Sequence, residues 1–105
     1  MSEFSVINDI LEHEQEIPED SILSQTIINK PATRVILFRF APGQELSEHT
    51  AAKPALLHFL EGEATVTLGD EVLDAGKNTI IHMAAHLPHS IVAKTAVSML
   101  LTLIG

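Results

Sequence analysis

Turn signals recur at a spacing of about 8–12 residues along most of this chain, and they restrict its possible folds more than any other feature. The segments between the turns are short and rich in β-branched and aromatic residues, as in Thr33–Phe40, which Pro42 and Gly43 follow. No long segment repeats its apolar residues with the 3.6-residue period of a helix. Short strands separated by regular turns are typical of all-β sandwiches and barrels, so we predict an all-β fold.

The strand prediction begins at residue 21 and continues almost to the end of the chain. Before it, residues 4–11 fit either a strand or a short helical turn. Residues 12–20 are acidic and contain a proline, so we expect an exposed connection with His13 at the surface. The predicted strands are 21–29, 33–40, 45–49, 55–60, 64–68, 71–73, 79–83, 90–94 and 98–104.

A chain of 105 residues has the length of one domain, and within a single domain 1–105 we expect N-terminal strands or an arm at 1–32 and a barrel at 33–104. The segments 55–60 and 98–104 are mostly apolar on both faces of the predicted strand, which indicates burial on both sides. A terminal segment or another subunit must then cover the outer face of the barrel. Since so small a domain has a thin margin of stability, we predict a homodimer, with a well-filled core as the alternative.

The composition excludes several classes of partner and site. The net charge is −8, from 14 acidic and 6 basic residues, whereas nucleic acids and anionic membrane surfaces require clustered Lys and Arg. The chain has no cysteine, so disulfides and thiolate metal sites are excluded. We see neither a signal peptide nor an apolar run of the roughly 20 residues that a membrane helix needs, and we therefore expect a cytoplasmic protein.

Histidines are concentrated in the predicted barrel. Neutral imidazole is the commonest metal ligand in proteins, and it suits zinc, copper, iron and nickel. A lone histidine on an apolar strand is more often a structural residue than a ligand, but a cluster without competing cysteines favours a metal site. The five histidines of this cluster are His49, His58, His82, His86 and His89.

The stretch from Pro42 to Gly69 resembles the cupin superfamily, and the resemblance extends over roughly residues 33–104. The first cupin motif has the form G-x5-H-x-H-x3,4-E-x6-G, and here Gly43 and His49 match its spacing while Gly62 stands at its closing glycine. The second motif matches more loosely, with its histidine at His89 in the sequence LPHSI. The resemblance implies an RmlC-like jelly-roll barrel of two antiparallel sheets.

The chain departs from both motifs at positions that hold metal in cupins. Ala51 replaces the second histidine of the first motif, and Ala55 replaces its glutamate. In the second motif, Ala84, His86 and Ala93 stand at the proline, glycine and asparagine positions. Of the four usual cupin ligands only two histidines remain, whereas bound zinc or iron normally takes three or four protein ligands.

These matches and departures leave more than one function open. The first hypothesis is a metalloprotein in which His49 and His89, joined by His58 and His82 if these converge on them, hold a divalent transition metal (Zn, Fe, Ni or Mn) beside a small-molecule ligand. The second is a metal-free ligand-binding or sensor module with the same pocket. A third is a structural partner whose exposed strands serve dimerisation. The fold alone decides neither among these nor whether the protein is an enzyme.

Overall fold

The computed structural model describes residues 3–12 and 16–105, so the expectation for His13 lies outside the described residues. Within these ranges the chain forms nine strands and no helix, which confirms the all-β prediction. Each observed strand begins and ends within two residues of its predicted bounds. The strands are β1 (Ile22–Lys30), β2 (Thr33–Phe40), β3 (Glu45–His49), β4 (Ala55–Glu61), β5 (Ala64–Leu68), β6 (Glu71–Ala75), β7 (Ile80–Met83), β8 (His89–Ala93) and β9 (Val97–Ile104).

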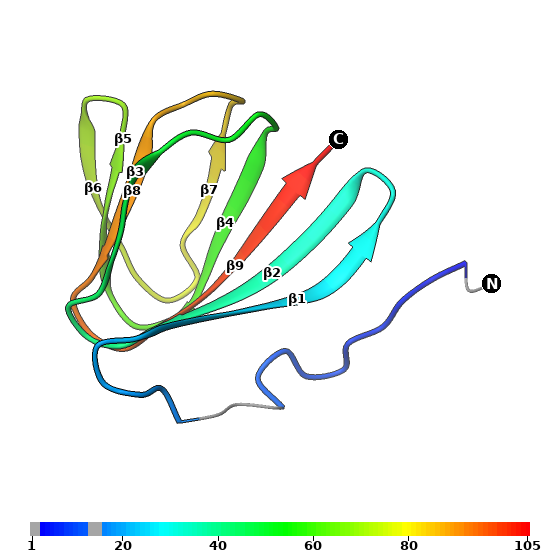
Figure 1. The fold of residues 1–105 in the computed structure, drawn as a ribbon, viewed down its shortest axis with the longest axis horizontal. Helices are drawn as coiled ribbons and strands as arrows, with labels where there is room; N and C mark the ends of the chain where they lie inside the picture. Colours follow the sequence, from blue (N-terminus) through cyan, green and yellow to red (C-terminus); the bar gives the residue numbers. More distant parts are fainter. Residues whose placement is uncertain (1–2, 13–15) are drawn as a thin grey trace.

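The strands form two sheets that face each other, as the cupin resemblance implies (Figure 1). The five-stranded sheet has the order β1-β2-β9-β4-β7, and the four-stranded sheet has the order β3-β8-β5-β6. Every pairing is antiparallel. Figure 1 shows the sheets converging at one end and opening at the other, where the β3–β4 and β7–β8 connections lie. We call this open end the mouth of the barrel.

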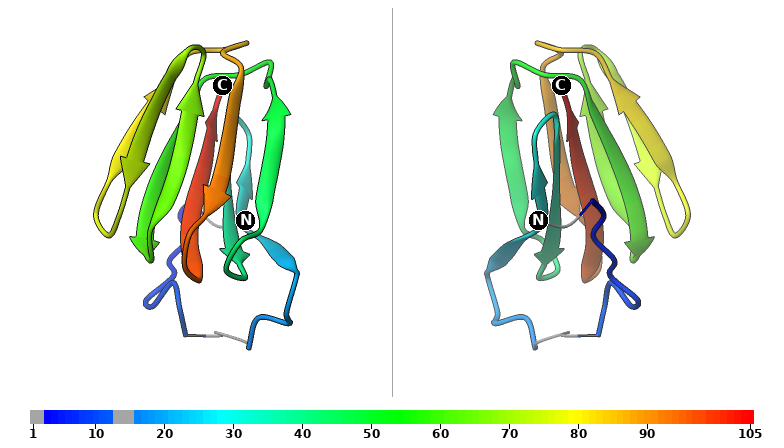
Figure 2. Two further views of the ribbon diagram at one scale, coloured as in Figure 1. Left: turned by 90° about the vertical axis from the view of Figure 1, so that its left-hand side faces the viewer. Right: turned by 90° about the vertical axis from the view of Figure 1, so that its right-hand side faces the viewer.

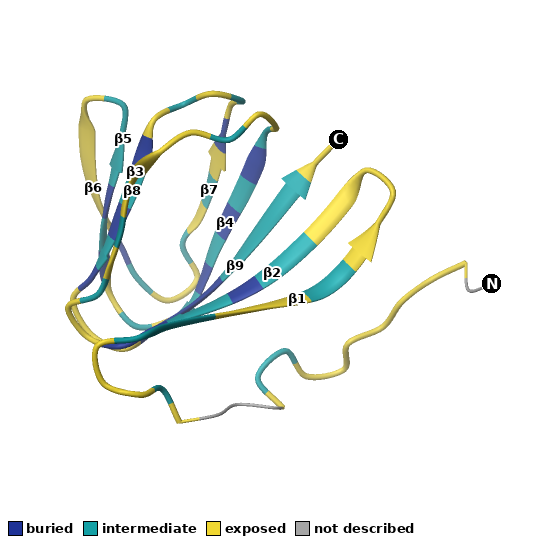
Figure 3. Ribbon diagram, in the orientation of Figure 1, coloured by how far each residue is buried: buried dark blue, intermediate teal, exposed yellow. Residues whose placement is uncertain are grey.

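The core fills the space between the two sheets. Along β4 the burial alternates, because successive side chains of a strand point to opposite faces (Figure 3). Ala55, Leu57 and Phe59 are 1% exposed or less and pack inward, while the residues between them are half-buried on the outer face. The largest fully buried side chains come from both sheets: Phe40, Phe59, Leu57, Ile91, Met99, Val66 and Val97.

Residues 3–12, which we call the arm, form no strand and no helix. The arm is irregular and ends in a single turn, where the Glu12 N–H donates to the Asp9 carbonyl at 3.1 Å. It runs on the outer side of the five-stranded sheet beside β1, as Figures 1 and 2 show. The arm therefore lies outside the barrel and contributes nothing to the mouth.

Candidate functional site

The mouth of the barrel brings His49 and His89 together. His49 ends β3 and His89 begins β8, and the two are direct partners across this antiparallel pair. Their ring centroids are 4.1 Å apart, with the ring planes tilted by 59°. His89 lies on the interior face of β8 and is only 6% exposed, whereas His49 is exposed at the rim. One imidazole is therefore held inside the barrel and the other faces the entrance.

A β-bulge in β3 turns His49 toward the interior. Leu46 pairs with Ile91 and packs against the core, and the next recorded pair joins His49 to His89. Three steps along β3 thus correspond to two along β8. Under strict alternation residues 46 and 49 would point to opposite faces of the sheet. The extra residue of the bulge shifts the alternation by one, so His49 points to the same face as Leu46.

The hydrogen bonds of both rings fix the same tautomer. His49 Nδ1 lies 2.8 Å from the Ser47 carbonyl oxygen, and His89 Nδ1 lies 2.9 Å from the Leu87 carbonyl oxygen. Because a carbonyl oxygen only accepts, each Nδ1 must carry the proton and donate it. In a neutral imidazole the Nε2 atom then keeps its lone pair. Both rings therefore present an Nε2 acceptor, in the orientation that backbone carbonyls commonly impose on metal-binding histidines.

The other predicted site residues lie elsewhere. His58 falls between inward-facing Leu57 and Phe59, so its side chain lies on the outer face of the five-stranded sheet. His82 is exposed on that same face of β7, next to the buried Met83. Its backbone pairs with Leu56. The structure thus places these two histidines near each other, separated from His49 and His89 by the sheet.

His86 lies in the β7–β8 connection, which a backbone hydrogen bond joins to the β3–β4 connection. Its backbone N–H donates to the Ala51 carbonyl at 2.7 Å, and its φ angle is +68°. Its side chain is exposed. Within residues 3–12 and 16–105, no group of three or more His, Asp or Glu side chains is arranged to hold a metal ion. On the described part of the chain, the candidate site is therefore the pair of imidazoles of His49 and His89.

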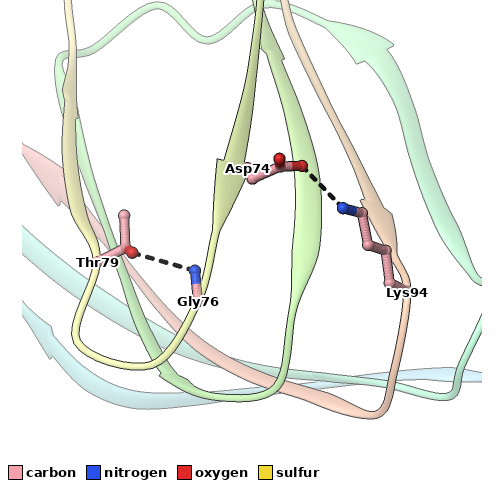
Figure 4. Close-up of polar contacts among 4 residues, drawn as sticks. All are labelled: Asp74, Gly76, Thr79 and Lys94. Carbon is pink, nitrogen blue, oxygen red and sulfur yellow. Dashed lines mark hydrogen bonds and ion pairs between the residues drawn. The ribbon is translucent and has the colours of Figure 1, made fainter.

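The opposite end of β8 carries a polar contact of another kind, drawn in Figure 4. Lys94 Nζ donates to Asp74 Oδ1 at 2.8 Å, and the Gly76 N–H donates to Thr79 Oγ1 at 3.1 Å. The hydrogen bond and negative charge of Asp74 raise the pKa of Lys94. Both members of this ion pair are largely exposed, so it stabilises the fold only weakly.

Comparison with known proteins defines the family. The Cupin domain family model matches residues 36–105, which is about two thirds of the chain. This chain belongs to the cupin family. No curated protein matches it. The membership in the cupin family that Gly43, His49, Gly62 and His89 indicated is therefore confirmed.

Solved cupin structures resemble it along most of its length. A cupin superfamily protein from Desulfitobacterium hafniense is 29% identical, with a TM-score of 0.81 over 86% of this chain and 83% of that one. A conserved protein of unknown function from Streptococcus pyogenes is 28% identical, with a TM-score of 0.83 over 98% and 90%. Salicylate 1,2-dioxygenase from Pseudoaminobacter salicylatoxidans shares only the fold, at 17% identity and a TM-score of 0.77 over 90% of this cupin and 30% of the dioxygenase.

Among the described residues, no helix has the length and apolar character needed to cross a bilayer.

Proposed function

We propose that this cupin binds a divalent transition metal ion through Nε2 of His49 and Nε2 of His89, together with a small molecule that enters from the mouth. The observation that carries the proposal is the matched pair of Nδ1–H···O=C hydrogen bonds, at 2.8 and 2.9 Å. These bonds fix the tautomer and the ring orientation before any metal arrives.

The donor set decides which metals fit. Imidazole nitrogen suits zinc, iron and nickel, whereas manganese prefers oxygen ligands, so manganese is the least suitable of the predicted ions. Two protein donors leave most of the coordination sphere to water and to the small molecule. When bound, such an ion would polarise an oxygen atom of that molecule.

The neighbouring residues suit a small ligand. Alanines stand at positions 51, 52 and 55, where larger side chains would narrow the mouth. Below them the barrel is closed by apolar side chains such as Leu57 and Met83, which are nearly inaccessible to water. In this proposal the buried His89 fixes the inner side of the ligand, and His49 contacts it at the rim.

One observation favours a second candidate, a metal-free ligand-binding module. The described residues include no third side chain to complete a metal site. The two Nε2 atoms would then accept hydrogen bonds from donor groups of the ligand, such as hydroxyl or amide groups. Both candidates use the same two residues, so they differ only in whether metal is required.

Metal content distinguishes the candidates. Protein purified without a histidine tag and dialysed against micromolar Zn²⁺ or Ni²⁺ should retain up to one ion per chain. His49→Ala and His89→Ala should lose that ion, since a single imidazole remains, whereas His82→Ala on the outer face serves as the matched control and should keep it. Equal metal content in all four proteins would contradict the metal proposal, and so would no metal in the unmodified chain, which would leave the second candidate.

We also propose that the chain forms a homodimer. The support is the outer face of the five-stranded sheet, which carries apolar side chains such as Leu56 and Leu100 that remain only half-buried in the single chain. A second subunit would bury them.

A further inference from the structure

The inner face of the four-stranded sheet carries one further polar side chain at the mouth. His89 of β8 pairs with Leu68 of β5, and Leu68 pairs with Glu71 of β6. Directly paired residues of antiparallel strands point to the same face, and both His89 and Leu68 point to the interior. Glu71 therefore points to the interior as well, in one row with His49, His89 and Leu68.

Burial along β6 agrees with this orientation. Ala75 faces inward and is 3% exposed, whereas Val72 faces outward and is 66% exposed. Glu71 lies four residues before Ala75, and since side chains alternate along a strand the two share a face. The side chain of Glu71 is itself exposed, so its carboxylate is accessible to a ligand that enters the mouth.

The sheet fixes the distance between Glu71 and His89. Neighbouring strands lie about 4.8 Å apart, so two steps across the sheet separate the Cα atoms of these residues by roughly 10 Å. A backbone hydrogen bond joins the segments that lead into them, because the Gly69 N–H donates to the Pro88 carbonyl at 2.8 Å. The carboxylate and the imidazole pair therefore face the mouth at a defined separation.

Every polar group of this row accepts hydrogen bonds. Nε2 of His49 and Nε2 of His89 keep their lone pairs, because each Nδ1 carries the proton. The carboxylate of Glu71 has no donor. Such a row binds groups that donate hydrogen bonds, and its negative end favours a cation over a neutral group. The net charge of −8 attracts a ligand of the same sign.

We propose that the small molecule is a short amino alcohol. Its ammonium group contacts the Glu71 carboxylate, and its hydroxyl group binds the imidazole pair or the metal ion there. This inference rests on the function proposed above and names the chemical class of the ligand. Hydrogen bonds of about 2.8 Å at both ends occupy part of the roughly 10 Å, which leaves roughly 4–5 Å for the ligand. A chain of three methylene groups has about this length, and it would lie against the half-buried Leu68.

The opposite sheet offers a rival group. Arg34 of β2 pairs with Leu103, which packs against the core, so Arg34 also faces the interior and suits an anionic ligand. It already donates to Thr26 Oγ1 at 3.5 Å, and β2 lies in a different sheet from β8. Glu71 shares both sheet and row with the imidazole pair, which favours the amine.

The first experiment compares three probes of similar length by NMR titration of the histidine ring signals, with and without zinc. The probes are 3-aminopropan-1-ol, butan-1-ol and 3-hydroxypropanoate. The amino alcohol should bind at least tenfold more tightly than butan-1-ol, because a hydrogen bond between two charged groups is among the strong ones. Failure of the amino alcohol to bind more tightly than butan-1-ol would overturn the proposal. Tighter binding of 3-hydroxypropanoate would also overturn it, in favour of an anion held by Arg34.

The second experiment tests Glu71 itself. Glu71→Gln keeps the shape of the side chain but removes its charge, and it should lose the tenfold preference for the amino alcohol. Glu45→Gln is the matched control, since Glu45 is exposed and pairs with Val92 on the outer face of the same sheet, and this variant should keep the preference. Equal preferences in the two variants would overturn the assignment of Glu71.

Metal content, measured on the same samples, separates this inference from the metal proposal. Neither Glu71→Gln nor Glu45→Gln should change the amount of zinc retained. A preference that depends on Glu71 in a chain that retains no zinc would support the amino alcohol and contradict the metal proposal. Zinc retained through His49 and His89 without any preference for the amino alcohol would contradict only this inference.

Discussion

Only glycine fits at position 62, because any side chain there would collide with the backbone. Gly43 has a similar backbone conformation without that collision, so comparing the two positions measures the cost of the collision. It lies in the turn between β4 and β5 with a φ of +87°, and an added Cβ would come within 2.0 Å of the Ala96 carbonyl oxygen. Gly43 has a similar φ of +81°, but an added Cβ there would meet nothing within 4 Å. Both alanine variants therefore carry the same backbone strain, and only Gly62→Ala adds a collision.

The magnitude follows from these two terms. Left-handed backbone costs an alanine about 1–2 kcal/mol, which is the whole expected loss for Gly43→Ala. At position 62 the segment 94–96 would have to retreat, but the backbone N–H groups of Lys94 and Thr95 donate to the Glu63 carbonyl at 2.9 and 3.3 Å. The Glu63 N–H also donates to Thr95 Oγ1 at 3.0 Å. Disrupting two or three such bonds, at about 1 kcal/mol each, gives a loss of about 3–5 kcal/mol for Gly62→Ala.

Urea unfolding of the two variants tests this reasoning. A difference of at least about 2 kcal/mol corresponds to a melting temperature lower by roughly 8 °C or more in a domain of this size. The loss at position 62 is a large part of the about 5–15 kcal/mol that stabilises a typical domain. Equal losses in the two variants would refute the argument, because they would mean that the 94–96 segment yields without cost.

Two further predictions concern the core and the surface charge. Phe59→Ala should lower the free energy of unfolding in urea by about 3–5 kcal/mol, since Phe59 is 0% exposed. Phe4 is 76% exposed, so Phe4→Ala should leave that free energy almost unchanged. Equal losses of stability in the two variants would contradict the assigned core. Lys94→Met should lower the melting temperature slightly at neutral pH. Asp74 raises the pKa of Lys94 above its ordinary 10.5. The difference in melting temperature between the unmodified chain and Lys94→Met should therefore be complete below pH 10.5 and disappear as the pH rises through the raised pKa. A difference in melting temperature that grows over that pH range would contradict the pairing.

The strands could be predicted from the sequence because the signals that define them are local. Alternation of apolar residues and the turn residues around them fix where a strand begins and which of its side chains share a face. Thr33–Phe40 and Ala64–Leu68 are found at their predicted bounds. The family motif also singled out His49 and His89, and the structure places their ring centroids 4.1 Å apart; their role as a site stays a prediction.

The orientation of the other histidines could not be predicted, because it depends on pairing between distant segments. The turn at Lys53 and Pro54 separates His58 from the first motif, and a turn can reset the alternation. In the structure β4 restarts at Ala55 as an inward residue, which puts His58 outside. The bulge that turns His49 inward is similarly invisible in the sequence, since it is defined by the register against β8.

The departures from the cupin motifs have a structural consequence at the mouth. Ala51 stands where the resemblance implies a metal-binding histidine, and here its carbonyl accepts a hydrogen bond from the backbone of His86 at 2.7 Å. His86 itself stands at the motif's glycine and keeps a φ of +68°, a conformation that histidine tolerates better than most side chains. A φ in this range is the conformation for which glycine is the usual residue, so the backbone at position 86 suits the motif's glycine although the side chain is histidine. The β7–β8 connection leads directly into His89, whose ring centroid lies 4.1 Å from that of His49.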